Sequence, residues 1–145
     1  MLLTLGLTME HVEGKLKEVP CDLLGGQTPR YAMITLGTEW GRQMINPNLW
    51  VNAAMHRVSG FKSSDPVVFD DCRFANEAQS IRDRGGYIIR VHRPDVSGSH
   101  HDHVSESEQD GIMNDYTIRN EGNIPDLKAN TDLIVQGLIN RLNYA

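Results

Sequence analysis

The sequence has 145 residues, of which 39% are hydrophobic and 23% are charged, and its formal net charge is −5. This length fits a single domain, 1–145, with a sizeable core, and no apolar stretch is long enough for a membrane span. The acidic balance and the single, scattered arginines argue against broad nucleic-acid binding, which needs clustered Lys and Arg.

The N-terminal segment, residues 1–18, carries apolar positions at helical spacing that are interrupted near Gly6. It lacks the basic region and the long apolar core of a signal peptide. Cys21 and Cys72 are too few for a disulfide framework and do not have metal-ligand spacing. We therefore expect a reduced, cytoplasmic protein.

Two cap-plus-proline patterns predict two helices in the first half of the chain. Thr28 can cap a helix that has Pro29 at its first position. The apolar residues between 33 and 40 then share one face, and Gly41 is expected to end or loosen this helix. Asn46-Pro47 repeats the pattern before a second helix that runs to Val58.

A strand, a helix and a strand are predicted next. The short apolar run Val67-Val68-Phe69 suits a buried parallel strand. A helix from Asn76 to Arg84 ends at Gly85-Gly86, and residues 87–91 form the following strand. This spacing is typical of a βαβ unit, so the two strands should be parallel.

The remaining residues predict a polar excursion and a last strand and helix. Residues 94–115 are rich in Ser, His, Asp and Glu and read as a lid-like excursion. Residues 116–118 can form a third strand, 120–123 a turn, and Pro125 opens a final helix. The chain is therefore expected to have an α/β fold, a parallel sheet flanked by helices.

A histidine cluster in the excursion is not expected to bind metal. Its members are contiguous, and no second element completes the ligand set that a metal needs. The four residues are His100, His101, Asp102 and His103.

The candidate chemistry lies where a predicted strand ends in charged residues. Ligands of open α/β sheets bind at the carboxyl ends of the strands. There Asp70 or Asp71 could hold Mg²⁺ or its water, and Arg73 could bind phosphate oxygens. An Asp–Arg ion pair or a helix cap explains the same residues equally well. Arg30, one residue inside a helix start, could bind phosphate or could be an ordinary surface arginine.

With these residues in place, the chain from about residue 10 to residue 142 resembles the bacteriophage-type deoxynucleoside monophosphate kinases, a branch of the P-loop kinases. The order and spacing of the motifs agree along almost the whole chain. Residues 36–42 and 71–77 are the most specific parts. The matching residues are Thr28-Pro29-Arg30, Leu36-Gly37-Thr38-Glu39-Trp40-Gly41-Arg42, Asp71-x-Arg73-Phe74-x-Asn76-Glu77, Gly85-Gly86, Arg93-Pro94, His103-x-Ser105-Glu106, and Asn120-x-Gly122 followed by Leu127.

The resemblance implies transfer of the γ-phosphoryl group of ATP to a deoxynucleoside monophosphate with Mg²⁺. It implies that Arg30 binds the acceptor phosphate, with Arg42 close by. Asp71 and Arg73 would face the reacting phosphates from a strand edge. The other two implied site residues are Arg93, at the start of the lid, and Asn120, near the adenine of ATP.

The sequence departs from the family in one respect, since it contains no Gly-x-x-x-x-Gly-Lys-Ser/Thr. That loop supplies the backbone cradle and the lysine that bind the ATP phosphates. We therefore expect a partial P-loop-kinase-like sheet that lacks the first strand, the phosphate-binding loop and the first helix. We also expect at most nucleotide or phosphate binding, with ATP and Mg²⁺ involved only if kinase activity survives.

Three explanations of this departure remain open. The chain could be a natural truncated relative, a fragment of a full kinase, or a chain that pairs with itself or with another protein to cover an exposed sheet. A non-enzymatic phage protein that binds a host or partner protein is the alternative function, with the host cytoplasm as its location. Under either function, we expect Arg30, Arg73 and Arg93 to share one pocket at the rim of the sheet.

Overall fold

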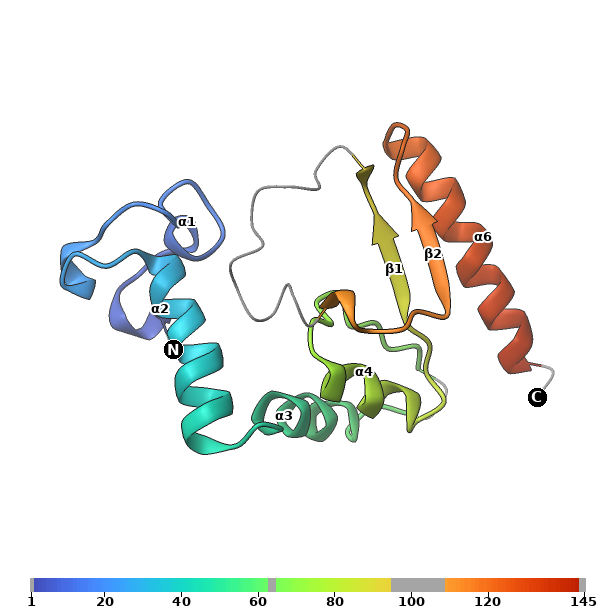
Figure 1. The fold of residues 1–145 in the computed structure, drawn as a ribbon, viewed down its shortest axis with the longest axis horizontal. Coiled ribbons are helices and arrows are strands. Elements are labelled where there is room, and N and C mark those ends of the chain that lie inside the picture. The colour runs from blue at the N-terminus through green and yellow to red at the C-terminus, as the bar shows by residue number, and fades with distance from the viewer. Residues whose placement is uncertain (1, 63–64, 95–108, 144–145) are drawn as a thin grey trace. The chain divides into compact units, whose positions relative to one another are not determined.

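The computed structural model describes residues 2–62, 65–94 and 109–143 (Figure 1). Its contacts divide the chain into two compact units, Met1–Asp65 and Pro66–Ala145. The single domain 1–145 therefore stays a prediction. Among the described residues, no helix combines the length and the apolar character that crossing a membrane requires.

The first unit is helical. Thr28 caps α2 by accepting a hydrogen bond from the backbone N–H of Tyr31 at 3.1 Å, and Pro29 is buried at the first helical position, as predicted. The predicted helical spacing over residues 1–18 yields only short turns, because Gly6 has a left-handed backbone with φ of 96°. The elements are η1 (Leu2–Leu5), α1 (Met9–Val12), η2 (Asp22–Leu24), α2 (Pro29–Thr35), η3 (Leu36–Ile45) and α3 (Leu49–Val58).

Gly41 loosens the predicted helix without ending it. The helix continues from α2 into η3, which is a π-helix, a wide form that often marks functional segments. The side chain of Trp50, on α3, covers Gly41 and donates its indole N–H to the carbonyl of Gly37 at 2.7 Å. This contact ties α3 to the wide segment that carries Arg42.

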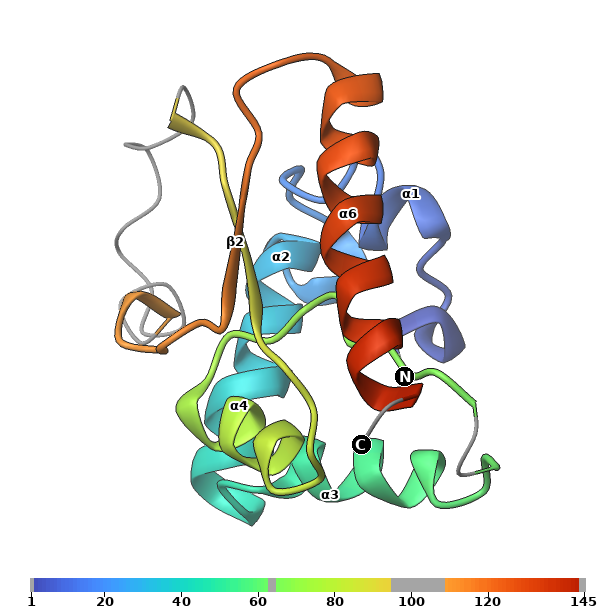
Figure 2. The same cartoon turned by 90° about the vertical axis from the view of Figure 1, so that its right-hand side faces the viewer.

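The second unit has a small parallel sheet. Strands β1 (Ile89–His92) and β2 (Tyr116–Arg119) pair in parallel, with Ile89 opposite Tyr116 and His92 opposite Arg119. Helix α4 (Ala75–Arg82) precedes β1, and α6 (Ile124–Asn143) runs alongside β2 in both views (Figures 1 and 2). The α/β class is thereby confirmed. The buried apolar residues of this unit are Ala78, Ile88 and Ile118.

The prediction of a strand at residues 67–69 is wrong. Residues 66–69 have no regular secondary structure, and Val68 is 86% exposed. The apolar residues are compatible with a strand, but a strand forms only by hydrogen bonding to a neighbour. In the described residues, the sheet consists of β1 and β2 alone. The predicted βαβ unit is replaced by the pairing of β1 with β2.

Side chains fix the starts of α4 and α6. The carboxylate of Glu77 accepts hydrogen bonds from the backbone N–H groups of Arg73 (2.8 Å) and Phe74 (3.0 Å) at the start of α4. At the start of α6, Asn123 and Asp126 each accept a backbone hydrogen bond from the other. These contacts satisfy N–H groups that a helix start leaves without partners.

Candidate functional site

The register of the sheet brings two predicted site residues to one edge. Arg93 directly follows β1 and Asn120 directly follows β2, and the strands run in the same direction. The backbone N–H of Asn120 donates to the carbonyl of His92 at 2.8 Å, which extends the pairing to the carboxyl ends. Arg93 is exposed and Asn120 is half-buried. This is the edge where parallel sheets bind their ligands.

Asp71 and Arg73 form an ion pair. Nε of Arg73 lies 2.5 Å from Oδ1 of Asp71, and both side chains are more than half exposed. Because residues 67–69 form no strand, the pair does not stand at the predicted strand edge but just before α4. Of the alternatives that the sequence left open, the structure has the ion pair, while Glu77 rather than Asp71 caps the helix.

In the first unit, Arg30 is also paired with a carboxylate. Its Nε donates to Oε1 of Glu18, and its backbone N–H donates to the carbonyl of Lys17 at 3.0 Å. Both side chains are about half exposed or more, so water competes for the pair, and such pairs contribute only about 0–1 kcal/mol. A phosphate dianion could replace the glutamate at modest cost.

Arg42 is positioned by the backbone. It lies on η3, is half-buried, and donates from a guanidinium nitrogen to the carbonyl of Pro47 at 3.3 Å. Arg30 and Arg42 belong to the first unit, whereas the four other site residues belong to the second. The predicted pocket shared by Arg30, Arg73 and Arg93 therefore stays a prediction.

Magnesium ligation receives no support from the residues present. Within 2–62, 65–94 and 109–143, no group of three His, Cys, Asp or Glu could hold an ion, and one oxygen of Asp71 is already bonded to Arg73. The histidine cluster 100–103 and most of the predicted lid lie outside the described residues.

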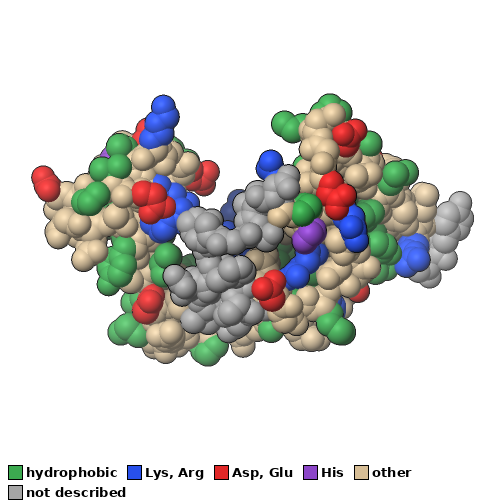
Figure 3. Space-filling view, turned by 45° about the horizontal axis from the view of Figure 1, so that its top comes forward, with side chains coloured by type: hydrophobic (Ala, Val, Ile, Leu, Met, Phe, Trp, Pro, Cys, Tyr) green, Lys and Arg blue, Asp and Glu red, His purple; other side chains and the backbone are tan. Residues whose placement is uncertain are grey.

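On the face shown in Figure 3, Lys and Arg side chains stand among acidic and hydrophobic ones within each unit. Several apolar side chains of the second unit are exposed as well, among them Val68 and Val91.

Sequence reasoning missed the residues that hold these elements in place. Glu77 lies three positions after Phe74, the spacing of a capping residue, so the pattern was readable. Asp115, which binds the backbone of Ile88, and Trp50, which binds the backbone of Gly37, act over long sequence separations. Nothing in the local sequence pattern points to those two contacts.

The surroundings of Cys72 predict how its reactivity depends on pH. Burial raises the pKa of the Cys72 thiol, and the nearby Glu77 carboxylate raises it further. In a Cys21→Ser variant, we expect the pH–rate profile of iodoacetamide alkylation to have its midpoint at higher pH in the folded protein than in urea, because only the thiolate reacts. Coincident midpoints would contradict this.

The comparisons with known proteins agree on one family. The family model of deoxynucleotide monophosphate kinase matches residues 10–131. A protein of Acanthamoeba polyphaga mimivirus named "Putative deoxynucleotide monophosphate kinase" is 35% identical over an alignment of 102 residues that covers 63% of this chain and 52% of that protein. The chain thus spans about half the length of this curated relative, and no solved structure matches it well enough to count as a relative. By its match to the family model over most of its length, this chain belongs to the deoxynucleotide monophosphate kinase family.

Proposed function

We propose that this chain binds a deoxynucleoside monophosphate and supplies the acceptor side of a phosphoryl-transfer site. The family match over residues 10–131 supports the substrate class. The observation that carries the proposal is the pairing of β1 with β2, because it brings Arg93 to the carboxyl edge of the sheet, next to Asn120, which the resemblance assigns to the adenine of ATP. A P-loop-kinase-like fold for this chain is part of the same proposal.

The arginines have the right chemistry for the phosphate. A guanidinium presents a planar fork of N–H groups that matches phosphate oxygens. Arg30 and Arg73 each bond one carboxylate through Nε, and both pairs are open to water. A dianionic phosphate can displace such a carboxylate, because the exposed pair itself is weak. In this proposal, each carboxylate holds its own guanidinium group, Glu18 that of Arg30 in the first unit and Asp71 that of Arg73 in the second, until a phosphate replaces it.

For the polypeptide 1–145 we propose binding without transfer from ATP. Its sequence contains no Gly-x-x-x-x-Gly-Lys-Ser/Thr, the loop whose backbone N–H groups and lysine hold the β- and γ-phosphates. A single oriented donor to the transition state is worth roughly 10²–10³ in rate, so arginines elsewhere do not replace the loop. The mimivirus relative accords with a viral setting in the host cytoplasm, which is also part of the proposal.

Equilibrium binding tests the proposal directly. Calorimetric titration of 1–145 with deoxynucleoside monophosphates, and with inorganic phosphate for comparison, should give saturable nucleotide binding. Arg93→Ala should weaken it roughly tenfold or more, since a hydrogen bond to a charged group contributes about 1.5–3 kcal/mol. The matched control is Arg141→Ala, which removes an exposed arginine from α6 and should leave the affinity unchanged.

Two outcomes would contradict the proposal. If the unmodified chain does not bind nucleotide at millimolar concentration, the proposal of a nucleotide site is wrong. An equal loss in Arg93→Ala and Arg141→Ala would show a general effect of charge rather than a site. Production of a deoxynucleoside diphosphate and ADP from ATP by this polypeptide would overturn the separate proposal that it binds without transfer.

A second candidate function, protein binding, is favoured by exposed apolar residues of the second unit. Val68 and Val91 are 86% and 57% exposed, and a second copy of this chain or a partner protein could cover them. Light scattering of the unmodified chain and of Val68→Lys tests this role. A dimer that dissociates in the variant supports it, whereas a monomer at every concentration speaks against self-association.

A further inference from the structure

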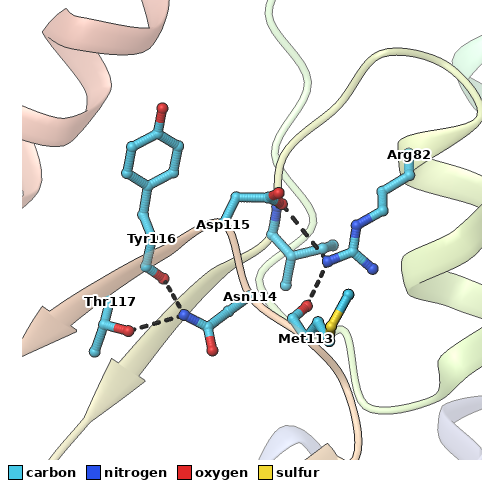
Figure 4. Close-up of polar contacts among 7 residues, drawn as sticks. Arg82, Met113, Asn114, Asp115, Tyr116 and Thr117 are labelled. Carbon is cyan, nitrogen blue, oxygen red and sulfur yellow. Dashed lines mark hydrogen bonds and ion pairs between the residues drawn. The ribbon is translucent and has the colours of Figure 1, made fainter.

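The amino ends of the two strands are joined by a cluster of side chains that the proposed function does not use. Figure 4 shows Arg82, from α4, pointing toward Asp115 and the carbonyl of Met113, which it bonds. The Asp115 carboxylate accepts a hydrogen bond from the backbone N–H of Ile88 at 2.7 Å. Asn114 donates to the carbonyl of Tyr116 at 3.0 Å.

Asp115 and Ile88 are bonded in both directions. The backbone N–H of Asp115 donates to the carbonyl of Ile88 at 2.8 Å, and that of Tyr116 donates to the same carbonyl at 3.2 Å. The carboxylate closes this set by accepting the N–H of Ile88. Ile88 and Asp115 each lie one position before the sheet begins. Together, these bonds fix the register in which β1 and β2 pair.

The register that is set at the amino ends also determines the alignment at the carboxyl ends, because the strands are only four residues long. Parallel pairing of short strands is weak, and a shift of one residue moves a strand by roughly 3.3 Å and reverses the faces of its side chains. A shift would therefore separate Arg93 from Asn120.

We infer that Asp115 is a positioning residue that sets the register of β1 and β2 and so holds Arg93 beside Asn120. The inference rests on the proposed function, which uses those two residues. The carboxylate acts chiefly as an acceptor for the Ile88 N–H, at 2.7 Å. Arg82, 3.6 Å away, supports the carboxylate and connects α4 to it.

The test compares three changes at Asp115 with a control. Asp115→Ala removes the acceptor, Asp115→Ser leaves a hydroxyl too short to reach Ile88, and Asp115→Asn keeps an acceptor oxygen in the same place. The control, Asp132→Ala, removes an exposed carboxylate from α6. Amide hydrogen exchange at Asn120, whose N–H is bonded to His92 at the far end of the sheet, and nucleotide affinity are both measured.

The expected pattern is graded. Asp115→Ala and Asp115→Ser should speed exchange at Asn120 and weaken nucleotide binding, each about tenfold or more. Asp115→Asn should stay within about threefold of the unmodified chain in both, because the acceptor remains. The control should change neither. If the alanine variant does not fold, the serine variant decides in the same way.

The inference and the function fail differently. If the unmodified chain binds no nucleotide, the proposed function is wrong. Hydrogen exchange at Asn120 in the Asp115 variants then still decides whether Asp115 sets the register. An unmodified chain that binds, with unchanged exchange and affinity in Asp115→Ala, overturns the inference alone. Equal damage in Asp115→Asn and Asp115→Ala also overturns it, because the charge, not the acceptor, would then be the essential property.

Discussion

Gly41→Ala should lower the free energy of unfolding of the first unit by about 1–3 kcal/mol, the cost of adding a methyl group to a packed interior. A Cβ at this position would lie 2.7 Å from Cζ2 and 2.8 Å from Nε1 of Trp50. The ring cannot shift freely, because its N–H is bonded to the carbonyl of Gly37 at 2.7 Å. The variant must therefore widen η3 further or break that hydrogen bond.

The same helix provides the matched control. A Cβ on Gly37 would meet nothing within 4 Å, so Gly37→Ala should stabilise the unit by about 0.5–1 kcal/mol through the better helix propensity of alanine. Urea unfolding followed by tryptophan fluorescence measures both variants, since Trp40 and Trp50 both belong to this unit. Opposite signs are expected, and a stable Gly41→Ala would show that the wide helix has room to spare.

A double-mutant cycle assigns the cost to the ring. In a Trp50→Ala background, the added methyl group of Gly41→Ala has no indole to meet, and its penalty should fall to within about 0.5 kcal/mol of zero. An unchanged penalty would place the strain in the helix backbone instead.

Local patterns predicted the elements whose formation depends on local contacts. Thr28 with Pro29 gave the start of α2, and the two glycines after α4 gave its end, where Gly85 has φ of 75°. The wide form of η3 was not readable, because it depends on Trp50 binding a carbonyl 13 residues away. Propensity alone does not distinguish an α-helix from a π-helix at Gly41.

The strand prediction at 67–69 failed for a reason that is not local. A run of three apolar residues is typical of a buried strand, but it does not specify a partner strand for hydrogen bonding. In the described residues, β1 pairs with β2 and Val68 remains exposed. Strands β1 and β2 were predicted correctly to within two residues at their ends, since each is followed along the chain by a parallel partner or a covering helix.

The sequence named candidate site residues, whose roles stay predictions, but not their arrangement. The resemblance pointed to Arg93 and Asn120 from motifs alone, and the register of the sheet brings them to one edge. For Asp71 and Arg73, the residue types allowed both a phosphate site and an ion pair, and the structure contains the pair. Which carboxylate each arginine contacts depends on folding, so spacing could not decide it.

The second large effect is expected at the centre of the sheet. Ile118 lies on β2, is 4% exposed, and belongs to the strand that α6 covers. Ile118→Ala should lower the free energy of unfolding of the second unit by about 2–5 kcal/mol, because it removes buried methyl and methylene groups and leaves a cavity. Since domains are stable by only about 5–15 kcal/mol, such a loss would remove a large share of the stability of the unit that carries Arg93 and Asn120.

Val91 is the natural comparison, because it stands opposite Ile118 on β1 and is 57% exposed. Val91→Ala should cost within about 0.5 kcal/mol, as exposed substitutions do. The ring pair of Tyr87 and Tyr116, with centroids 6.0 Å apart, gives a near-ultraviolet circular dichroism signal for this unit. Equal losses at the two positions would mean that α6 does not protect β2, and the carboxyl edge would then lack the rigid support that nucleotide binding requires.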